Sequence, residues 1–148
     1  MHVIQRRPAA TARLRGERGN SNLSGIVRFY QFPCGILVEA DIAGLGNNAE
    51  GFYGFHIHTG GACTGENFSA TEGHFNPDAQ LHPRHAGDLP PLMSYGGRAY
   101  MAVMTDRFSI SDILGRTVVI HESPDDFQSQ PAGNAGSKIA CGVICRSA

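Results

Sequence analysis

Seven short runs of aliphatic, aromatic and β-branched residues dominate this chain, and residues that favour turns separate them. Nineteen glycines and eight prolines in 148 residues supply the turns, and this pattern is typical of an antiparallel sandwich or barrel. The one helical signal is "SISDILG" at 109–115, which predicts about one turn that Ser109 caps and Gly115 ends. The expected strands cover residues 11–16, 24–32, 35–45, 51–59, 98–106, 115–122 and 138–146.

The length of the chain indicates a single domain over residues 1–148, with a flexible basic segment over residues 1–10. The formal net charge of -1 gives no global field that would favour nucleic acid or an anionic membrane. No apolar run approaches the roughly 18 residues of a membrane span, and the N-terminus lacks the apolar core of a secretory signal. We therefore expect a soluble protein that binds neither nucleic acid nor membrane, in the cytoplasm unless a leader was removed.

Two stretches, residues 59–96 and 123–137, carry no strand pattern. Connections of this length in a compact domain are usually functional or disordered. The first stretch is rich in Gly, Pro and His and follows the run "GFHIHTGG" at 54–61. Alternate side chains of a strand share a face, so His56 and His58 are expected to point to one side, and Phe55 and Ile57 to the other. On its own, this pair suits ordinary polar positions on the solvated face of a sheet better than a metal site.

The other histidines favour a metal site over a solvated face. Six of the seven in the chain lie at this strand end, in the first long loop or at the end of the run "RTVVIH": His56, His58, His74, His82, His85 and His121. Asp88 follows His85 by three residues and adds an oxygen donor. Imidazoles suit copper, zinc, iron or nickel, and four ligands of mixed His and Asp suit zinc. Motifs for nucleotide binding or for serine-type and zinc-protease hydrolysis are absent from the sequence.

Five motifs in order resemble the copper/zinc superoxide dismutase family. They are "GFHIH" at 54–58, "GHFNP" at 73–77, "HAGDLP" at 85–90, "GRTVVIHE" at 115–122 and "GNAGSKIACGVI" at 133–144. The resemblance extends from about residue 11 to the end and implies an all-β, Greek-key sandwich or flattened barrel with two long loops at the metal site. The resemblance is to bacterial members, with shortened zinc and electrostatic loops.

The resemblance also implies a set of ligands. The copper ligands would be His56, His58, His74 and His121, and the zinc ligands would be His74, His82, His85 and Asp88. Asp125 would hydrogen-bond ligands of both metals and fix their orientation. Cys63 and Cys141 would form a disulfide, while Cys34 and Cys145 are expected to stay free.

The activity that the resemblance implies is the disproportionation of superoxide to oxygen and hydrogen peroxide, with copper for electron transfer and zinc as a structural and tuning ion. His74 would release copper and take up a proton when copper is reduced. Lys138 would attract the anionic substrate from a position where the family usually has arginine. An ammonium lacks the rigid fork of a guanidinium, so we expect lower but retained activity relative to an arginine variant.

Two departures from the family leave alternatives open. Only Pro83 and Arg84 separate His82 from His85, and the loop from Glu122 to Gly133 is short. A copper-only enzyme is one alternative, and a non-catalytic protein that buffers or delivers copper or zinc is another. A zinc hydrolase that uses His85 and Asp88 has no evident general base. Family members include dimers and monomers, and the residues do not decide for or against a homodimer.

Overall fold

A computed structural model describes residues 5–17, 19–46 and 48–148, so the first four residues of the expected N-terminal segment lie outside the described part. Its strands and helical segments are β1 (Ala10–Gly16), β2 (Ser24–Phe32), β3 (Gly35–Ala43), β4 (Phe52–Tyr53), β5 (Phe55–His58), the 3-10 segment η1 (Glu66–Thr71), β6 (Leu92–Met93), β7 (Arg98–Thr105), α1 (Ile110–Ile113), β8 (Thr117–His121) and β9 (Lys138–Arg146). Among the described residues, no helix has the length and apolar composition needed to cross a bilayer.

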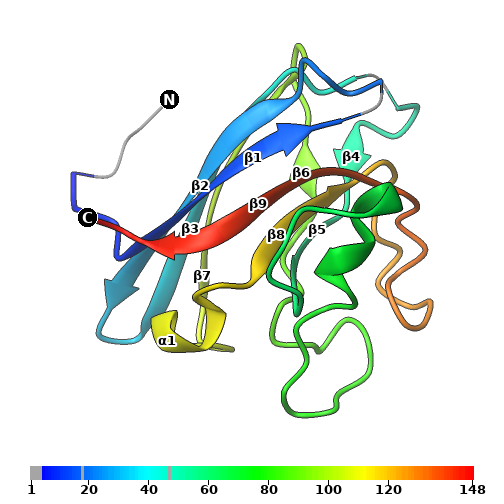
Figure 1. Cartoon of the computed structure of the whole chain (residues 1–148). Helices are drawn as coiled ribbons and strands as arrows, with labels where there is room; N and C mark the ends of the chain where they lie inside the picture. Colours follow the sequence, from blue (N-terminus) through cyan, green and yellow to red (C-terminus); the bar gives the residue numbers. More distant parts are fainter. Residues whose placement is uncertain (1–4, 18, 47) are drawn as a thin grey trace.

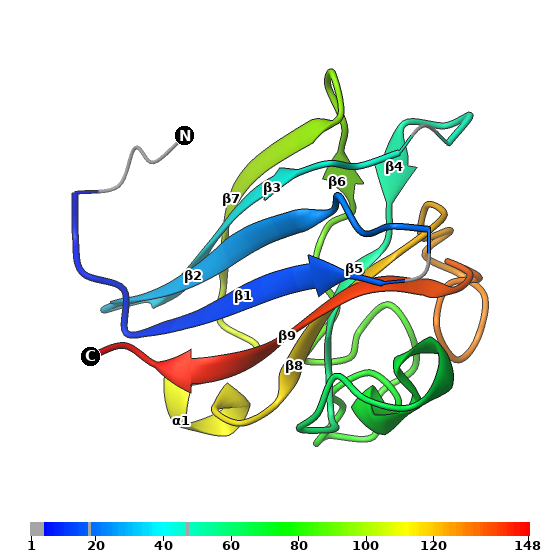
Figure 2. The same ribbon diagram turned by 45° about the horizontal axis from the view of Figure 1, so that its top comes forward.

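One curled antiparallel sheet of seven strands forms the body of the molecule, in the order β5-β8-β9-β1-β2-β3-β7 (Figures 1 and 2). The strands β4 and β6 pair separately. β4 continues through Gly54 into β5, and β6 leads through a turn into β7, so this ribbon joins the two edge strands of the large sheet. Between β7 and β8 the chain crosses from one edge of the sheet to the strand next to the opposite edge strand, β5. The predicted all-β Greek-key fold is therefore confirmed.

Local sequence signals explain the bounds of several elements. Pro33 and Cys34 form a tight turn between β2 and β3, and Phe32 pairs with Gly35 beside it. The expected capping of α1 is present, since Ser109 Oγ accepts a hydrogen bond from the Asp112 N–H at 3.3 Å. The run expected as one strand over residues 51–59 is divided at Gly54 into β4 and β5. β4 pairs with β6, whereas β5 pairs with β8. A Cβ on Gly54 would lie 2.7 Å from Ala135 Cβ, so the loop over 122–137 approaches the backbone closely at this position.

Alternation along the strands separates the core from the opposite face of the sheet. Phe55 and Ile57 on β5 pack into the main hydrophobic core with Val118 and Ile120 on β8. The residues between them face the other way, where the loops over 59–91 and 122–137 cover the end of the sheet (Figure 1). The histidines on this second face are therefore buried although they lie outside the main core.

A disulfide between Cys63 and Cys141 ties the first loop to β9, with a Cα–Cα distance of 5.7 Å. Beside it, Phe68 from η1 packs on Val119 and Cys141 in a small second cluster. Cys34 and Cys145 are free and exposed. The predicted pairing of the cysteines is thus confirmed.

Candidate metal centre

The loop that carries His74 runs along the free edge of β5. The Phe75 N–H donates to the Ile57 carbonyl at 2.8 Å, and the Ile57 N–H donates to the Gly87 carbonyl at 2.8 Å. His58 pairs across this edge with His74, and His56 pairs with Asp88. The backbone pairing places the loop histidines beside those of the strand.

The first group of side chains consists of four buried histidines. One potential ligand atom from each lies within 4.8 Å of all the others. His56 and His58 come from β5, His121 ends β8 next to it, and His74 comes from the loop. The period of two along the strand accounts for the common direction of His56 and His58. The group contains His56, His58, His74 and His121.

Two of these rings have their outer nitrogen engaged by a backbone carbonyl. His58 Nδ1 lies 2.8 Å from the Glu72 oxygen, and His121 Nδ1 lies 3.0 Å from the Gly136 oxygen. A carbonyl only accepts, so each Nδ1 carries the hydrogen and each Nε2 of the neutral ring presents a bare lone pair. These two Nε2 atoms lie 3.2 Å apart. Two facing lone pairs repel each other, and a cation between them removes that repulsion.

The other two rings also leave one nitrogen each for a ligand. His56 Nε2 binds Asp125 Oδ2 at 2.8 Å, and His74 Nδ1 binds Asp88 Oδ1 at 2.8 Å. His56 Nδ1 and His74 Nε2 are buried and have no hydrogen-bond partner. Buried polar atoms without partners are costly. A metal ion resolves that cost, and four imidazole nitrogens suit copper.

The second group joins His74 to the residues that follow it. Its members are His74, His82, His85 and Asp88, again with one potential ligand atom each within 4.8 Å. His85 Nδ1 lies 3.2 Å from His74 Nδ1 and 3.2 Å from Asp88 Oδ2. His82 Nδ1 lies 3.1 Å from Asp88 Oδ2, although without the geometry of a hydrogen bond. Three nitrogens and a carboxylate suit zinc.

The structure thus brings together all seven residues predicted as ligands, including His82, for which the short connection to His85 left doubt. His74 belongs to both groups, because its two ring nitrogens face opposite ways.

Asp125 links the two groups. One carboxylate oxygen binds His56 Nε2 and the other binds His82 Nε2, each at 2.8 Å. Burial alone would raise the pKa of Asp125, but the hydrogen bonds from both histidines hold the pKa well below its usual range. Gly133, at φ 72°, makes room for this bridge, since a Cβ there would lie 2.1 Å from Asp125 Oδ1.

Burial favours the neutral form of three histidines of the first group, His56, His58 and His121. It lowers the pKa of His56 to about 4, although Asp125 opposes the shift. Burial and then the proximity of His56 lower the pKa of His121 to about 3. Burial, followed by the nearby His74, also lowers the pKa of His58 well below its usual value. Neutral rings are the form in which imidazole binds a metal.

We expect the protein without bound metal to become less stable as the pH falls from about 7 to about 5. The pKa of an unfolded histidine is about 6.5, whereas the pKa values of folded His56 and His121 are about 4 and about 3. Between these values only the unfolded chain takes up protons, so acid favours unfolding. Each ring should lower the free energy of unfolding by on the order of 1 to 2 kcal/mol over this interval.

Urea unfolding of the metal-free protein at the two pH values measures this loss. The His121→Ala variant is the matched control and should show a smaller change with pH. An unfolding free energy that stays constant between the two pH values would contradict the expectation.

Lys138, predicted to attract an anion, lies next to His121 in the pairing of β8 with β9. Its Nζ donates to Thr71 Oγ1 at 2.8 Å and to the Glu72 carbonyl at 3.1 Å, and burial lowers its pKa. It also lines a surface pocket of about 480 Å³ whose wall includes Glu17, Glu66 and Glu122. The ammonium is therefore fixed beside the first group by the same loop that orients His58.

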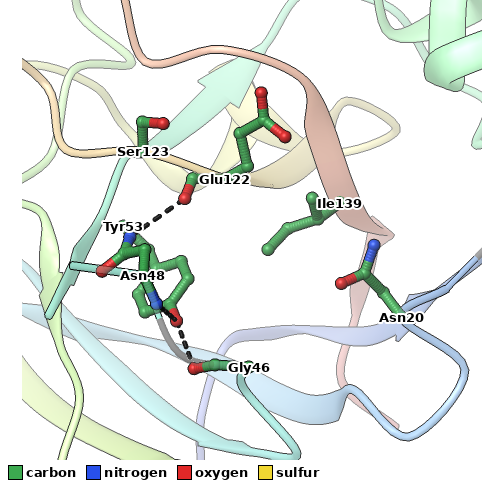
Figure 3. A pocket seen from close by; sticks show the side chains of 7 residues that line it. All are labelled: Asn20, Gly46, Asn48, Tyr53, Glu122, Ser123 and Ile139. Carbon is green, nitrogen blue, oxygen red and sulfur yellow. Dashed lines mark hydrogen bonds between the residues drawn. The ribbon is translucent and has the colours of Figure 1, made fainter.

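A neighbouring pocket of about 370 Å³ shares Glu122 as a lining residue and has no histidine in its lining (Figure 3). Asn48 Nδ2 donates to the Glu122 carbonyl at 3.0 Å, and the Tyr53 hydroxyl donates to the Gly46 carbonyl. The first of these bonds ties Asn48 to the start of the second loop. The donors for a metal lie in the histidine groups and not in this pocket.

Sequence reasoning missed the groups that orient His58 and His121. The Glu72 and Gly136 oxygens belong to the backbone, which every residue type carries. No residue pattern could therefore have identified them.

Comparison with known proteins adds independent evidence. Residues 23–144 match the model of the family described as copper/zinc superoxide dismutase (SODC). Superoxide dismutase [Cu-Zn] 2 of Aquifex aeolicus (strain VF5) is 39% identical over 135 residues, which cover 81% of this chain and 78% of that protein. Superoxide dismutase [Cu-Zn] A of Xenopus laevis is 39% identical over 142 residues, which cover 85% of this chain and 91% of that protein.

A second kind of relative also matches. The copper chaperone for superoxide dismutase of Homo sapiens is 35% identical over 144 residues, which cover 88% of this chain but only 51% of that protein. The chain therefore spans about half the length of this relative.

Copper and zinc are the cofactors for which the family is named, and the two groups of donors fit them. The family model covers most of the chain, and the fold, the disulfide and the donor groups agree with it. The chain belongs to the copper/zinc superoxide dismutase family.

Proposed function

We propose that this protein is a superoxide dismutase that converts superoxide to oxygen and hydrogen peroxide. In this proposal His56, His58, His74 and His121 hold copper, and His74, His82, His85 and Asp88 hold zinc. The observation that carries it is the convergence of four ring nitrogens, two of them buried without a hydrogen-bond partner and two facing each other as bare lone pairs.

Bound copper supplies the one-electron chemistry by which two superoxide ions and two protons give one oxygen and one hydrogen peroxide. The chain supplies the positioning and the protons. His74 engages Asp88 through Nδ1, so Nε2 is the atom at which this ring can hold and release a proton. Asp125 keeps His56 and His82 in fixed orientations through their other nitrogens. Lys138 provides the positive charge that docks the anion.

Charge at position 138 should control the rate. We expect Lys138→Gln to lower the second-order rate constant for superoxide decay about tenfold and to weaken its dependence on ionic strength, because electrostatic attraction of the substrate is lost. Lys138→Arg should raise the rate constant above that of the unchanged protein, since a guanidinium offers two parallel donors. Stopped-flow measurements at low and high salt test both variants. A lower rate for Lys138→Arg would contradict this role.

Copper delivery is the second candidate function, because the human copper chaperone for superoxide dismutase is among the relatives. Stopped-flow measurement of superoxide decay with copper- and zinc-loaded protein, beside the metal-free and zinc-only forms, separates the two. Acceleration that requires copper supports the dismutase. Stoichiometric copper without acceleration would overturn the dismutase and favour delivery or buffering.

A further inference from the structure

Side chains from two other parts of the chain hold the turn from His82 to His85. The turn carries two of the four donors of the second group, and only Pro83 and Arg84 separate them. So short a connection has few residues of its own with which to fix two imidazoles. The contacts that fix the backbone of this turn therefore determine the affinity of the second group for its metal ion.

Gln130, in the loop after β8, binds both backbone polar groups of His82. Its Oε1 accepts from the His82 N–H at 2.9 Å, and its Nε2 donates to the His82 carbonyl at 2.7 Å. The same Nε2 donates to the Gln128 carbonyl at 3.2 Å, which ties the amide to its own loop. A primary amide carries the donor and the acceptor side by side, as this pairing requires.

Arg107, just before α1, binds the rest of the turn. Its Nη1 donates to the Pro83 carbonyl at 2.9 Å and to the His85 carbonyl at 3.2 Å. Hydrogen bonds from a charged donor are stronger than neutral ones. Arg107 thereby restrains the backbone on both sides of Arg84.

The remaining contacts of the turn come from the group itself. The His85 N–H donates to Asp88 Oδ2 at 3.0 Å, and His82 Nε2 lies 2.8 Å from Asp125 Oδ1. Gln130 and Arg107 offer no ligand atom of their own, yet they set where both imidazoles of the turn lie. Their effect should therefore appear in the affinity for the ion and in its coordination geometry.

We propose that Gln130 and Arg107 are positioning residues that clamp the turn 82–85 and so determine the affinity of the second group for zinc. This inference rests on the proposed function, in which the second group holds zinc. All four histidines of the copper group lie outside the clamped turn 82–85, and the copper group shares only His74 with the zinc group. Loss of the clamp should therefore weaken zinc binding and leave copper binding to the zinc-free chain nearly unchanged.

The test measures zinc affinity with a competing chelator and coordination with cobalt(II) in place of zinc. We expect Gln130→Leu and Arg107→Gln each to lower zinc affinity by about 10- to 100-fold and to reduce the visible absorption typical of tetrahedral cobalt(II). Arg107→Lys, which keeps a charged donor, should recover part of the affinity. Gln130→Glu should not, because a carboxylate oxygen would face the His82 carbonyl.

Two matched controls lie next to the clamp. Gln128→Leu changes an exposed glutamine of the same loop, and Arg84→Gln removes an exposed charge from the turn itself. Both should leave the zinc affinity unchanged.

The possible results are distinguishable. An unchanged chain that binds no zinc or cobalt(II) at this group would overturn the proposed function and this inference with it. Tight binding by the unchanged chain and equally tight binding by the clamp variants would overturn this inference alone. Equal losses of zinc affinity, copper affinity and unfolding free energy would indicate general destabilisation and would also overturn it.

Discussion

Replacing His121 with alanine should abolish the catalysis of superoxide decay. The change removes one of four converging imidazole donors, and the side chain of alanine cannot replace it. We expect the copper-dependent rate constant to fall by at least about 100-fold, since even residues that only support a ligand cost 10- to 100-fold in metal affinity or activity. Zinc binding should remain, because His121 is not a member of the second group. Stopped-flow superoxide decay and metal analysis of the same sample measure both effects.

Val119→Ala is the matched control for this experiment. Val119 lies on the same strand and face as His121, and it is fully buried in the small cluster beside the disulfide. The control shortens a buried side chain without removing a donor, so it should keep most of the activity. A His121→Ala protein that still accelerates superoxide decay at the original rate would exclude the proposed copper site.

Loss of the Cys63–Cys141 disulfide should cause the largest loss of stability. The bond joins residues 78 positions apart, and closure of a loop of that length contributes about 4 kcal/mol by restricting the unfolded chain. The double variant Cys63→Ser/Cys141→Ser, or reduction of the unchanged protein, should lower the free energy of unfolding by this amount. Urea unfolding of the oxidised and reduced forms measures it.

The same change should also affect the site. The bond anchors the loop whose Glu72 carbonyl orients His58 and whose Thr71 hydroxyl holds Lys138. Copper affinity should therefore fall together with stability. Cys34→Ser/Cys145→Ser is the control, because these exposed cysteines are free, and it should change neither quantity. If the reduced and oxidised proteins unfold at the same urea concentration, the disulfide has no such role.

Much of the fold and of the site follows from the alternation of residues along strands. The pattern at 54–58 placed His56 and His58 on one face, and the run 115–122 placed His121 on the neighbouring strand. The division of the expected strand at Gly54 could not be read from the pattern, because it depends on two different partner strands that are distant in sequence, β6 for β4 and β8 for β5. The residue pattern of one segment predicts the local conformation of that segment, but it does not predict which distant segments will pack against it.

The supporting contacts of the site were also beyond sequence reasoning. Gln130 and Arg107 stand among other exposed polar residues, and neither forms part of a recognisable motif. Their roles depend on which backbone groups of the turn 82–85 face them after folding. Ligands are conspicuous because few residue types bind metals, whereas almost any polar side chain can support a backbone.

In the proposed arrangement His74 holds both ions, so the binding of copper and the binding of zinc would be thermodynamically interdependent. A shift of the His74 ring that improves its contact with one ion also moves the nitrogen that the ring presents to the other ion. By the reciprocity of linked equilibria, the factor by which zinc changes the affinity for copper must equal the factor by which copper changes the affinity for zinc. The order of loading can alter the rate of assembly, but the total binding free energy of the filled site is the same by either route.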